Sequence, residues 1–225
     1  VPYRIAGPAS AADATWRGSA NSARRTTDMR LTGSNLTAVR GFKTIFTDLS
    51  FDVTDGELMA VTGPNGVGKS TLLRIVAGLA VPASGTVACE PANEDGYRHQ
   101  VHYLGHLDGL KPTLTVWQNL EFWRRFWGSG DIDEGLERLG IPHLAHLPVA
   151  VLSAGQKRRT AMARLTLATR PIWLLDEPLT ALDTAAEAVF AGLLSDHMAA
   201  GGLALAATHR DLPVAATRQL AMEAA

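Results

Sequence analysis

The sequence predicts an α/β fold in which a mostly parallel sheet is covered by helices. Continuous apolar runs of strand length are followed by helical patterns, which is typical of strands buried on both faces. One such run, Leu58–Thr62, leads through a glycine-rich loop into a helix that begins near Thr71 and ends near Gly78. Another, Ile172–Leu175, ends in two carboxylates. Strands that alternate with helices in this way favour a parallel sheet.

The remaining strands follow from shorter apolar runs. Before the glycine-rich loop, the pattern predicts two or three short strands, at Leu31-Thr32, Leu36–Val39 and Leu49–Val53. Beyond the loop it predicts strands over residues 85–89, 101–104 and 203–207, and a helix over 185–200. The run over 203–207 is expected to be the last strand.

The sequence pattern changes over about residues 107–168, and this tract is expected to form a helical subdomain. Thr115 can cap a helix that Gly128 ends, and Asp131 or Asp133 can start a second helix. A third helix in this tract is expected to run to about Ala168.

Aromatic side chains are dense in the first of these helices. Phe122 and Phe126 are expected to pack into the core. Trp123 or Trp127 is a candidate for the wall of a groove that receives a helix of another protein.

Composition limits the classes of function. The chain has 225 residues, enough for one domain with a proper core, and its formal net charge of −1 provides no basic field for nucleic acid. The single cysteine, Cys89, excludes an internal disulfide framework and is expected to be a buried structural thiol. No apolar run approaches the roughly 20 residues of a membrane span, so any spanning is expected of other chains.

The first 28 residues differ from the rest, because they are rich in Ala, Ser, Thr and Arg and show no periodicity. Arg24-Arg25 is not followed by the apolar run of an export signal, so we reject that interpretation. We expect either a disordered extension over residues 1–28 or a mis-assigned start, with Met29 as the effective first residue. The folded domain then covers residues 29–225.

The glycine-rich loop is the most specific motif. It fits the phosphate-binding pattern G-x-x-x-x-G-K-[ST] and reads Gly63-Pro64-Asn65-Gly66-Val67-Gly68-Lys69-Ser70-Thr71. Its glycines allow a tight turn that brings backbone N–H groups against phosphate oxygens. Lys69 is expected to reach the β- and γ-phosphates, and the Ser70 hydroxyl to ligate Mg²⁺. We refer to residues 63–71 as the P-loop.

Two carboxylates follow the apolar strand over residues 172–175. The end of this strand is expected at the carboxyl edge of the sheet, where the P-loop also lies. Asp176 can then hold Mg²⁺, directly or through water. Glu177, one residue further on, can polarise the water that attacks the γ-phosphate.

A third motif, Leu152-Ser153-Ala154-Gly155-Gln156, resembles the LSGGQ signature of ATP-binding-cassette (ABC) ATPases, with Ala154 in place of the first glycine. We call residues 152–156 the signature segment. Ser153 is expected to cap a helix whose N-terminus favours anions. Ala181-Leu182-Asp183 and His209 also stand where these ATPases have their D-loop and their switch histidine. The resemblance covers about residues 31–212.

This resemblance implies a P-loop NTPase of the ABC type, with a mostly parallel sheet core, antiparallel N-terminal strands and an inserted helical subdomain. It implies a homodimer that holds two ATP molecules, with Mg²⁺, between head-to-tail chains. Each signature segment would close on the nucleotide of the partner.

The same resemblance implies roles for individual residues. Ser153, Gly155, Gln156 and Asp183 would contact the nucleotide at the dimer interface. Glu177 would be the catalytic base, assisted by Lys69 and by His209, which would contact the γ-phosphate and position Glu177 and the water.

Two positions depart from the general ABC pattern. His106 stands where the Q-loop glutamine is expected, and it could touch the water of the metal or link to a membrane partner. Arg40 stands at the place of the aromatic residue that stacks on adenine, with Phe42 two residues further on. A guanidinium plane can also stack on a base, so Arg40 is a candidate for adenine binding.

These departures indicate a narrower group within the ABC ATPases. The histidine at the Q-loop, LSAGQ followed by Lys157-Arg158-Arg159, and Trp173 before LLDEP are similar to the ATP-binding subunits of haem exporters in cytochrome c maturation. This implies an ATPase docked on integral membrane permease subunits, peripheral at the cytoplasmic face of the inner membrane, without nucleic acid. The ATPase of another small exporter, or a soluble ABC ATPase serving an assembly scaffold, are the alternatives.

Overall fold

The computed structural model describes residues 29–91 and 96–223. The expected extension over residues 1–28 therefore lies outside the described residues. Among the described helices, none is both long and apolar enough to cross a membrane.

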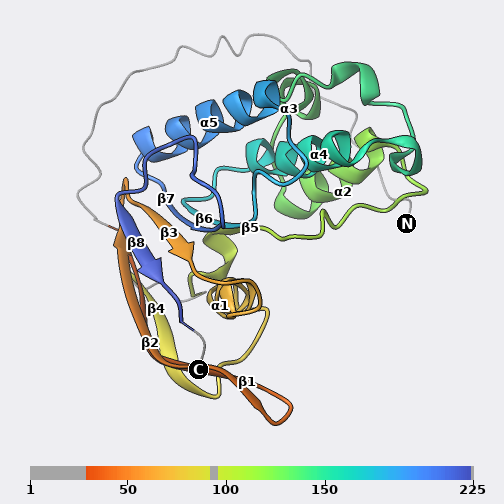
Figure 1. Cartoon of the computed structure of the whole chain (residues 1–225). Coiled ribbons are helices and arrows are strands. Elements are labelled where there is room, and N and C mark those ends of the chain that lie inside the picture. Colours follow the sequence, from red (N-terminus) through yellow and green to blue (C-terminus); the bar gives the residue numbers. More distant parts are fainter. Residues whose placement is uncertain (1–28, 92–95, 224–225) are drawn as a thin grey trace, which may run out of the picture.

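Two sheets form the frame of the molecule (Figure 1). The larger sheet is parallel throughout and has the strand order β5-β6-β7-β3-β8. Its strands are β3 (Leu58–Thr62), β5 (Val101–Leu104), β6 (Ile172–Asp176), β7 (Leu203–Ala207) and β8 (Arg218–Ala221). The smaller sheet is antiparallel, in the order β2-β1-β4, with β1 (Arg30–Arg40), β2 (Lys43–Thr54) and β4 (Ser84–Glu90).

Helices cover both faces of the parallel sheet. Helix α1 (Lys69–Val76) lies between the two sheets, whereas the other α-helices lie on the opposite side, as Figure 1 shows. These are α2 (Val116–Trp127), α3 (Ile132–Arg138), α4 (Ala154–Leu167) and α5 (Thr184–Ala199). Short 3-10 turns occur at Arg98–Gln100, Pro142–Leu144 and Val149–Val151.

The parallel sheet separates two apolar cores because successive side chains of a strand point to opposite faces. On β6, Ile172 and Leu174 join the core formed with α1 and the antiparallel sheet. Trp173 and Leu175 join the core formed with α2 to α5. All four are at most 5% exposed, which explains why this strand reads as a continuous apolar run.

Local capping signals set the helix ends as predicted. Thr115 and Gln118 form a reciprocal capping box at the start of α2, and Gly128 ends that helix with a φ of 75°. The Asp131 side chain caps α3 by accepting from the backbone N–H groups of Asp133 and Glu134.

The N-terminal strands are longer than predicted. The runs expected at Leu31-Thr32 and Leu36–Val39 are one strand, β1, and the run expected from Leu49 is the end of β2. Polar residues interrupt the apolar pattern of β1 because the pairing with β2 shifts between Gly33 and Leu36. Asn35, with a φ of 51°, takes up this bulge without ending the strand.

Two other expectations were wrong. The strand over residues 203–207 is not the last, because β8 adds a short, mostly exposed strand beside β3. Phe122 and Phe126 are 56% and 69% exposed rather than in the core. In their place, Trp123 and Trp127 pack against the core, since that face of α2 turns toward α4. Cys89 is buried, as expected.

Candidate active site

The P-loop joins β3 to α1 and has the backbone conformation that its glycines allow. Gly63, Gly66 and Gly68 have φ values of 136°, 79° and 113°, in the region that side chains disfavour. A Cβ on Gly63 would also lie 2.3 Å from the Met222 carbonyl oxygen. Lys69 is 7% exposed, and its ammonium donates to the carbonyl oxygens of Gly63 at 2.7 Å and Pro64 at 3.2 Å. The lysine is thus held over its own loop.

Ser70 and Asp176 meet at the carboxyl edge of the parallel sheet. The Ser70 Oγ donates a hydrogen bond of 2.9 Å to Asp176 Oδ1, although the residues are 106 positions apart. Asp176 is 2% exposed at the end of β6. A hydroxyl and a carboxylate that converge in this way are the hard oxygen donors that Mg²⁺ prefers. Burial and the nearby Asp176 carboxylate raise the pKa of Tyr103 to about 12, so this phenol stays protonated.

Glu177 and His209 form a second pair beside the P-loop. His209 Nδ1 lies 2.8 Å from Glu177 Oε2, and the two side chains are 55% and 17% exposed. Glu177 has a φ of 48°, and its backbone N–H donates to the Ala207 carbonyl at the end of β7. This backbone conformation is uncommon for a residue other than glycine and is found where the surrounding structure fixes it. The neighbouring strand therefore holds the turn that aims the Glu177 carboxylate.

These residues line one cleft of about 600 Å³, which we call the P-loop cleft. Sequence-predicted residues in its wall are Arg40, Asn65, Gly66, Gly68, Lys69, Ser70, Thr71, His106, Glu177 and His209. Ile45 and Thr180 also line it but were not predicted as site residues. Gly63, Pro64 and Val67 shape the loop from outside the lining, and Asp176 lies beneath it.

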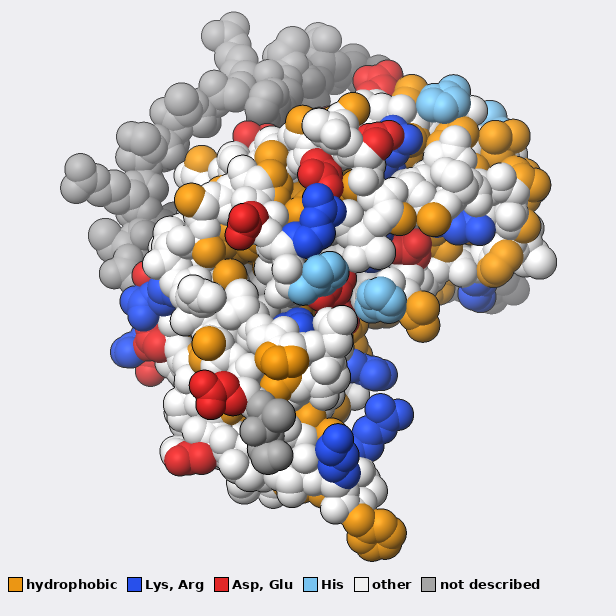
Figure 2. All heavy atoms as spheres, in the orientation of Figure 1, with side chains coloured by type: hydrophobic (Ala, Val, Ile, Leu, Met, Phe, Trp, Pro, Cys, Tyr) orange, Lys and Arg blue, Asp and Glu red, His pale blue; other side chains and the backbone are white. Residues whose placement is uncertain are grey.

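The β1–β2 hairpin brings Arg40 to the cleft. Lys and Arg side chains gather near the end of this hairpin in Figure 2. Arg40 and Ile45 line the cleft, whereas Phe42 at the hairpin turn is fully exposed and does not. A guanidinium and a branched aliphatic side chain are therefore the groups available beside the loop for a flat base.

The signature segment does not line the P-loop cleft. Ser153 and Gln156 instead form a reciprocal capping box at the start of α4, with the Ser153 Oγ accepting from the Gln156 backbone N–H at 3.3 Å. Ser153 is exposed. A Cβ on Gly155 would lie 2.7 Å from the Ala181 carbonyl oxygen, so the signature segment packs closely on the segment Ala181–Asp183. Asp183 is itself used as the cap of α5, accepting from the Ala186 N–H.

The sequence motifs assigned no role to one buried cation near the cleft. Arg158 on α4 is 3% exposed and donates to the backbone carbonyls of Asp176 and Glu177. The signal was present, because Arg158 lies three and four residues before Ala161 and Met162, which are fully buried on the same helix face. A charge on the apolar face of a helix predicts a buried polar partner.

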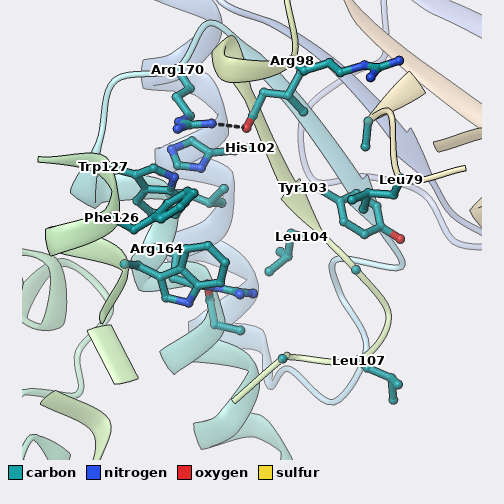
Figure 3. Close-up of a pocket in the computed structure, with 17 residues that line it drawn as sticks. Leu79, Arg98, His102, Tyr103, Leu104, Leu107, Phe126, Trp127, Arg164 and Arg170 are labelled. Carbon is teal, nitrogen blue, oxygen red and sulfur yellow. Dashed lines mark hydrogen bonds between the residues drawn. The ribbon is translucent and has the colours of Figure 1, made fainter. Parts of the chain in front are cut away.

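A separate groove lies between the sheet and the helical side of the molecule (Figure 3). It has a volume of about 390 Å³, and Leu79, Leu107 and Phe126 at its rim are more than half exposed. We call it the aromatic groove, because Trp123, Phe126 and Trp127 supply its α2 wall. Its cationic lining residues are Arg98, Arg164 and Arg170, and none of the Asp or Glu residues that the structure describes lines it.

The cations of the aromatic groove lie against its rings. The guanidinium carbons of Arg164 and Arg170 lie 5.4 and 5.0 Å from the ring centroids of Trp123 and Trp127. Burial lowers the pKa of Arg164 to about 10, which still leaves it charged at neutral pH.

His102, which is 2% exposed, also lines the aromatic groove. Its ring lies 4.8 Å from that of Trp127, edge to face, and its Nε2 lies 2.8 Å from the Ala168 carbonyl oxygen. Burial lowers the pKa of His102 to about 3, which keeps it neutral.

Comparisons with known proteins agree with this site. The sequence profile of the ABC transporter family matches residues 46–180. The chain is 49% identical to a cytochrome c biogenesis ATP-binding export protein CcmA of Rhodopseudomonas palustris, over 88% of this chain and 100% of that protein. It is 50% identical to the CcmA protein of Bradyrhizobium diazoefficiens, over 83% and 94% of the two chains.

Solved structures show the same architecture. The ATP-binding cassette MJ0796, in a dimeric post-hydrolysis state bound to ADP and Pi, aligns with a TM-score of 0.75 and 26% sequence identity. The alignment covers 86% of this chain and 94% of that one. The predicted fold class, a parallel sheet with antiparallel N-terminal strands and added helices, is thereby confirmed.

Proposed function

Because this chain belongs to the ABC transporter family and, within it, to the CcmA group of cytochrome c biogenesis ATP-binding export proteins, we propose that it hydrolyses ATP to drive an export step of cytochrome c maturation. The observation that carries the ATPase activity is the P-loop cleft, where Lys69, Ser70, Glu177 and His209 lie together. The export role rests on the CcmA relatives. Haem, or a haem-loaded carrier, is the cargo that this group implies.

The chain's own residues supply binding and positioning. The P-loop N–H groups and Lys69 hold the phosphates of ATP, and Arg40 with Ile45 holds the adenine. Ser70 and Asp176 fit Mg²⁺, which would neutralise phosphate charge when bound. His106 lines the same cleft, where its imidazole would serve the water shell of the metal.

Water activation falls to the Glu177–His209 pair. The Glu177 carboxylate accepts the proton of the attacking water, and His209, 2.8 Å away, orients that carboxylate and reaches the γ-phosphate. Most of the rate acceleration comes from charge already in place around the phosphates, since phosphoryl transfer needs little covalent help from the protein.

The signature segment acts on a second copy of the chain. Ser153, Gly155, Gln156 and Asp183 lie outside the P-loop cleft of their own chain, and the related cassette MJ0796 is described as a dimer. A head-to-tail homodimer with two ATP molecules at its interface brings each signature segment to the γ-phosphate in the partner. Hydrolysis removes that contact and releases the pair.

The aromatic groove is the docking surface for the membrane permease. Its exposed apolar rim and its cationic interior suit an amphipathic helix that carries an acidic side chain. The chain then sits at the cytoplasmic face of the inner membrane, held by its partners.

Glu177→Gln tests the proposal. The variant keeps the shape of the side chain but cannot accept the proton. It should therefore bind ATP without turnover, and a stable ATP-bound dimer should accumulate. Light scattering should show a dimer with ATP and a monomer with ADP. Turnover of ATP at the parental rate by this variant would contradict the assignment of Glu177 as the base.

A further inference from the structure

Arg158 on α4 joins the signature helix to the segments that hold the proposed catalytic residues. It is 3% exposed, and all three guanidinium nitrogens donate hydrogen bonds. An arginine buried to this degree is stable only when its charge and its donors are matched. The partners therefore show what the side chain does.

Three of the bonds clamp the turn of the catalytic base. Nη2 donates to the carbonyl oxygens of Asp176 at 2.9 Å and Glu177 at 2.8 Å, and Nε donates to that of Pro178 at 3.3 Å. These carbonyls flank the Glu177 backbone, whose φ of 48° is disfavoured for a residue with a side chain. Arg158 thus stabilises the conformation that directs Glu177 toward His209.

The remaining bonds reach the segment of His106. Nη1 donates to the Gly105 carbonyl oxygen at 2.8 Å and to Asp108 Oδ1 at 3.2 Å. Gly105 directly precedes His106, which lines the P-loop cleft. Asp108, whose side chain is 24% exposed, supplies the negative charge that matches the buried guanidinium.

The position of Arg158 on α4 connects these contacts to the signature segment. Arg158 is two residues beyond Gln156, which with Ser153 caps the N-terminus of the same helix. A helix moves as a rigid element over such a short distance, so a shift of the signature segment also shifts the guanidinium. The cleft of one chain is therefore linked mechanically to the segment that its partner's ATP engages.

We propose that Arg158 is a positioning residue for ATP hydrolysis, which makes the aim of Glu177 depend on the seating of the signature segment. This inference rests on the proposed function, since it requires Glu177 to be the base. It predicts that the loss of Arg158 slows the chemical step while ATP still binds, because the described hydrogen bonds of this side chain go to Gly105, Asp108 and residues 176–178 and not to the P-loop or Arg40.

The choice of arginine is itself informative. Its planar fork presents donors in several directions, whereas the single nitrogen of lysine cannot reach the carbonyls of Gly105 and Pro178 at once. A lysine keeps the charge opposite Asp108 but should hold only part of the clamp. Methionine keeps most of the apolar stem and removes every donor.

Steady-state kinetics of the full-length chain with ATP and Mg²⁺ provide the test. We expect kcat to fall by about 100-fold in Arg158→Met and by about tenfold in Arg158→Lys, with KM and ATP affinity within about twofold of the parent. Met162→Ala is the matched control for stability. Met162 is fully buried on the same helix but has no N–H or O–H to donate to these carbonyls from its side chain, so the variant should lower the melting temperature and keep the parental kcat below it.

The outcomes distinguish failure of the positioning role of Arg158 from failure of the proposed function. Parental kcat in Arg158→Met, while Glu177→Gln is inactive, overturns the positioning role alone. A rise in KM at unchanged kcat also overturns it, because the side chain would then serve binding. If the parent itself does not hydrolyse ATP, the proposed function and this inference fall together. If Arg158→Met does not fold, the lysine variant decides, and a parental kcat there overturns the proposal.

Discussion

The P-loop cleft and the signature segment differ in what their polar groups do within one chain. In the cleft, residues distant in sequence already engage each other, as in the bond of Ser70 to Asp176 and the contact of His209 with Glu177. In the signature segment, Ser153 and Gln156 only cap their own helix. One chain therefore assembles the half of the site that binds phosphate, whereas the other half presents a capped helix end to the outside.

Because of this difference, ATP binding and ATP turnover can be separated by mutation. A site that closes within one chain binds ATP alone, but a site that needs a second chain hydrolyses ATP only after pairing. Changes at the P-loop should then affect both ATP binding and turnover, and changes in the signature segment should affect turnover only.

Lys69→Ala should have the largest effect. The change removes the only lysine that lines the cleft within the described part of the chain, so the phosphates lose their direct cationic partner. We expect ATP affinity and turnover to fall together, with turnover lower by at least about 100-fold. Isothermal titration with ATP and a phosphate-release assay check this. If the folded variant consumed ATP as fast as the parent, the assignment of the cleft would be wrong.

Ser153→Asp should affect turnover without affecting binding. Aspartate caps a helix as well as serine does, so the stability of α4 should be kept. Its carboxylate would, however, face the γ-phosphate of the partner, and turnover should fall by about 100-fold. Ser153→Asn is the matched control, since it caps the helix without a charge and should stay within a few-fold of the parent. Weakened ATP binding to the monomeric Ser153→Asp variant would contradict the prediction that the signature segment affects turnover only.

Phe126→Asp should affect membrane docking without affecting ATP binding or turnover. Phe126 lines the aromatic groove at its rim, so a carboxylate that the docked partner covers there should weaken membrane association by about tenfold when the permease subunits are co-expressed. Phe122→Asp is the matched control, because Phe122 is 56% exposed one turn earlier and does not line the groove. Equal loss of membrane association in both variants would argue against the groove as the docking surface.

His102→Gln should have the smallest effect, seen only in acid. The pKa of His102 is lowered to about 3 in the folded state, so below the unfolded value of 6.5 the unfolded chain binds a proton that the folded chain does not. Stability is then unaffected above that value and decreases as the pH falls through it. Between pH 7.5 and pH 5 the parent should lose about 2 kcal/mol more than the glutamine variant. Urea unfolding at the two pH values measures this, and equal losses would contradict it.

Prediction from sequence succeeded where the signal is local. The P-loop, the caps at Thr115 and Ser153 and the apolar strand over β6 each depend on neighbouring residues, so their patterns are visible in the chain. The four residues of β8 have no such pattern, since the strand exists only because β3 offers it an edge.

The site residues that the sequence did not predict depend on contacts between distant parts of the chain. The place of Arg158 on the apolar face of α4 predicts a buried polar partner but not which one, because its partners are backbone carbonyls 18 to 53 positions away, which have no sequence identity to recognise. Ile45 lines the cleft because the β1–β2 hairpin folds back on the P-loop, where a Cβ on Gly68 would lie 2.6 Å from its Cγ2. Contacts of this kind follow from the tertiary arrangement and not from a motif.

Mixing Lys69→Ala with Ser153→Asp is the most direct test of whether ATP is hydrolysed at an interface between two chains. Each variant alone should be inactive, for different reasons. In the mixed dimer, the Ser153→Asp chain supplies an intact P-loop cleft and the Lys69→Ala chain an intact signature segment, so one of the two sites is whole. ATP hydrolysis should reappear on mixing and peak near equal amounts of the two chains. A mixture that stays as inactive as its components would contradict hydrolysis at an interface shared by two chains.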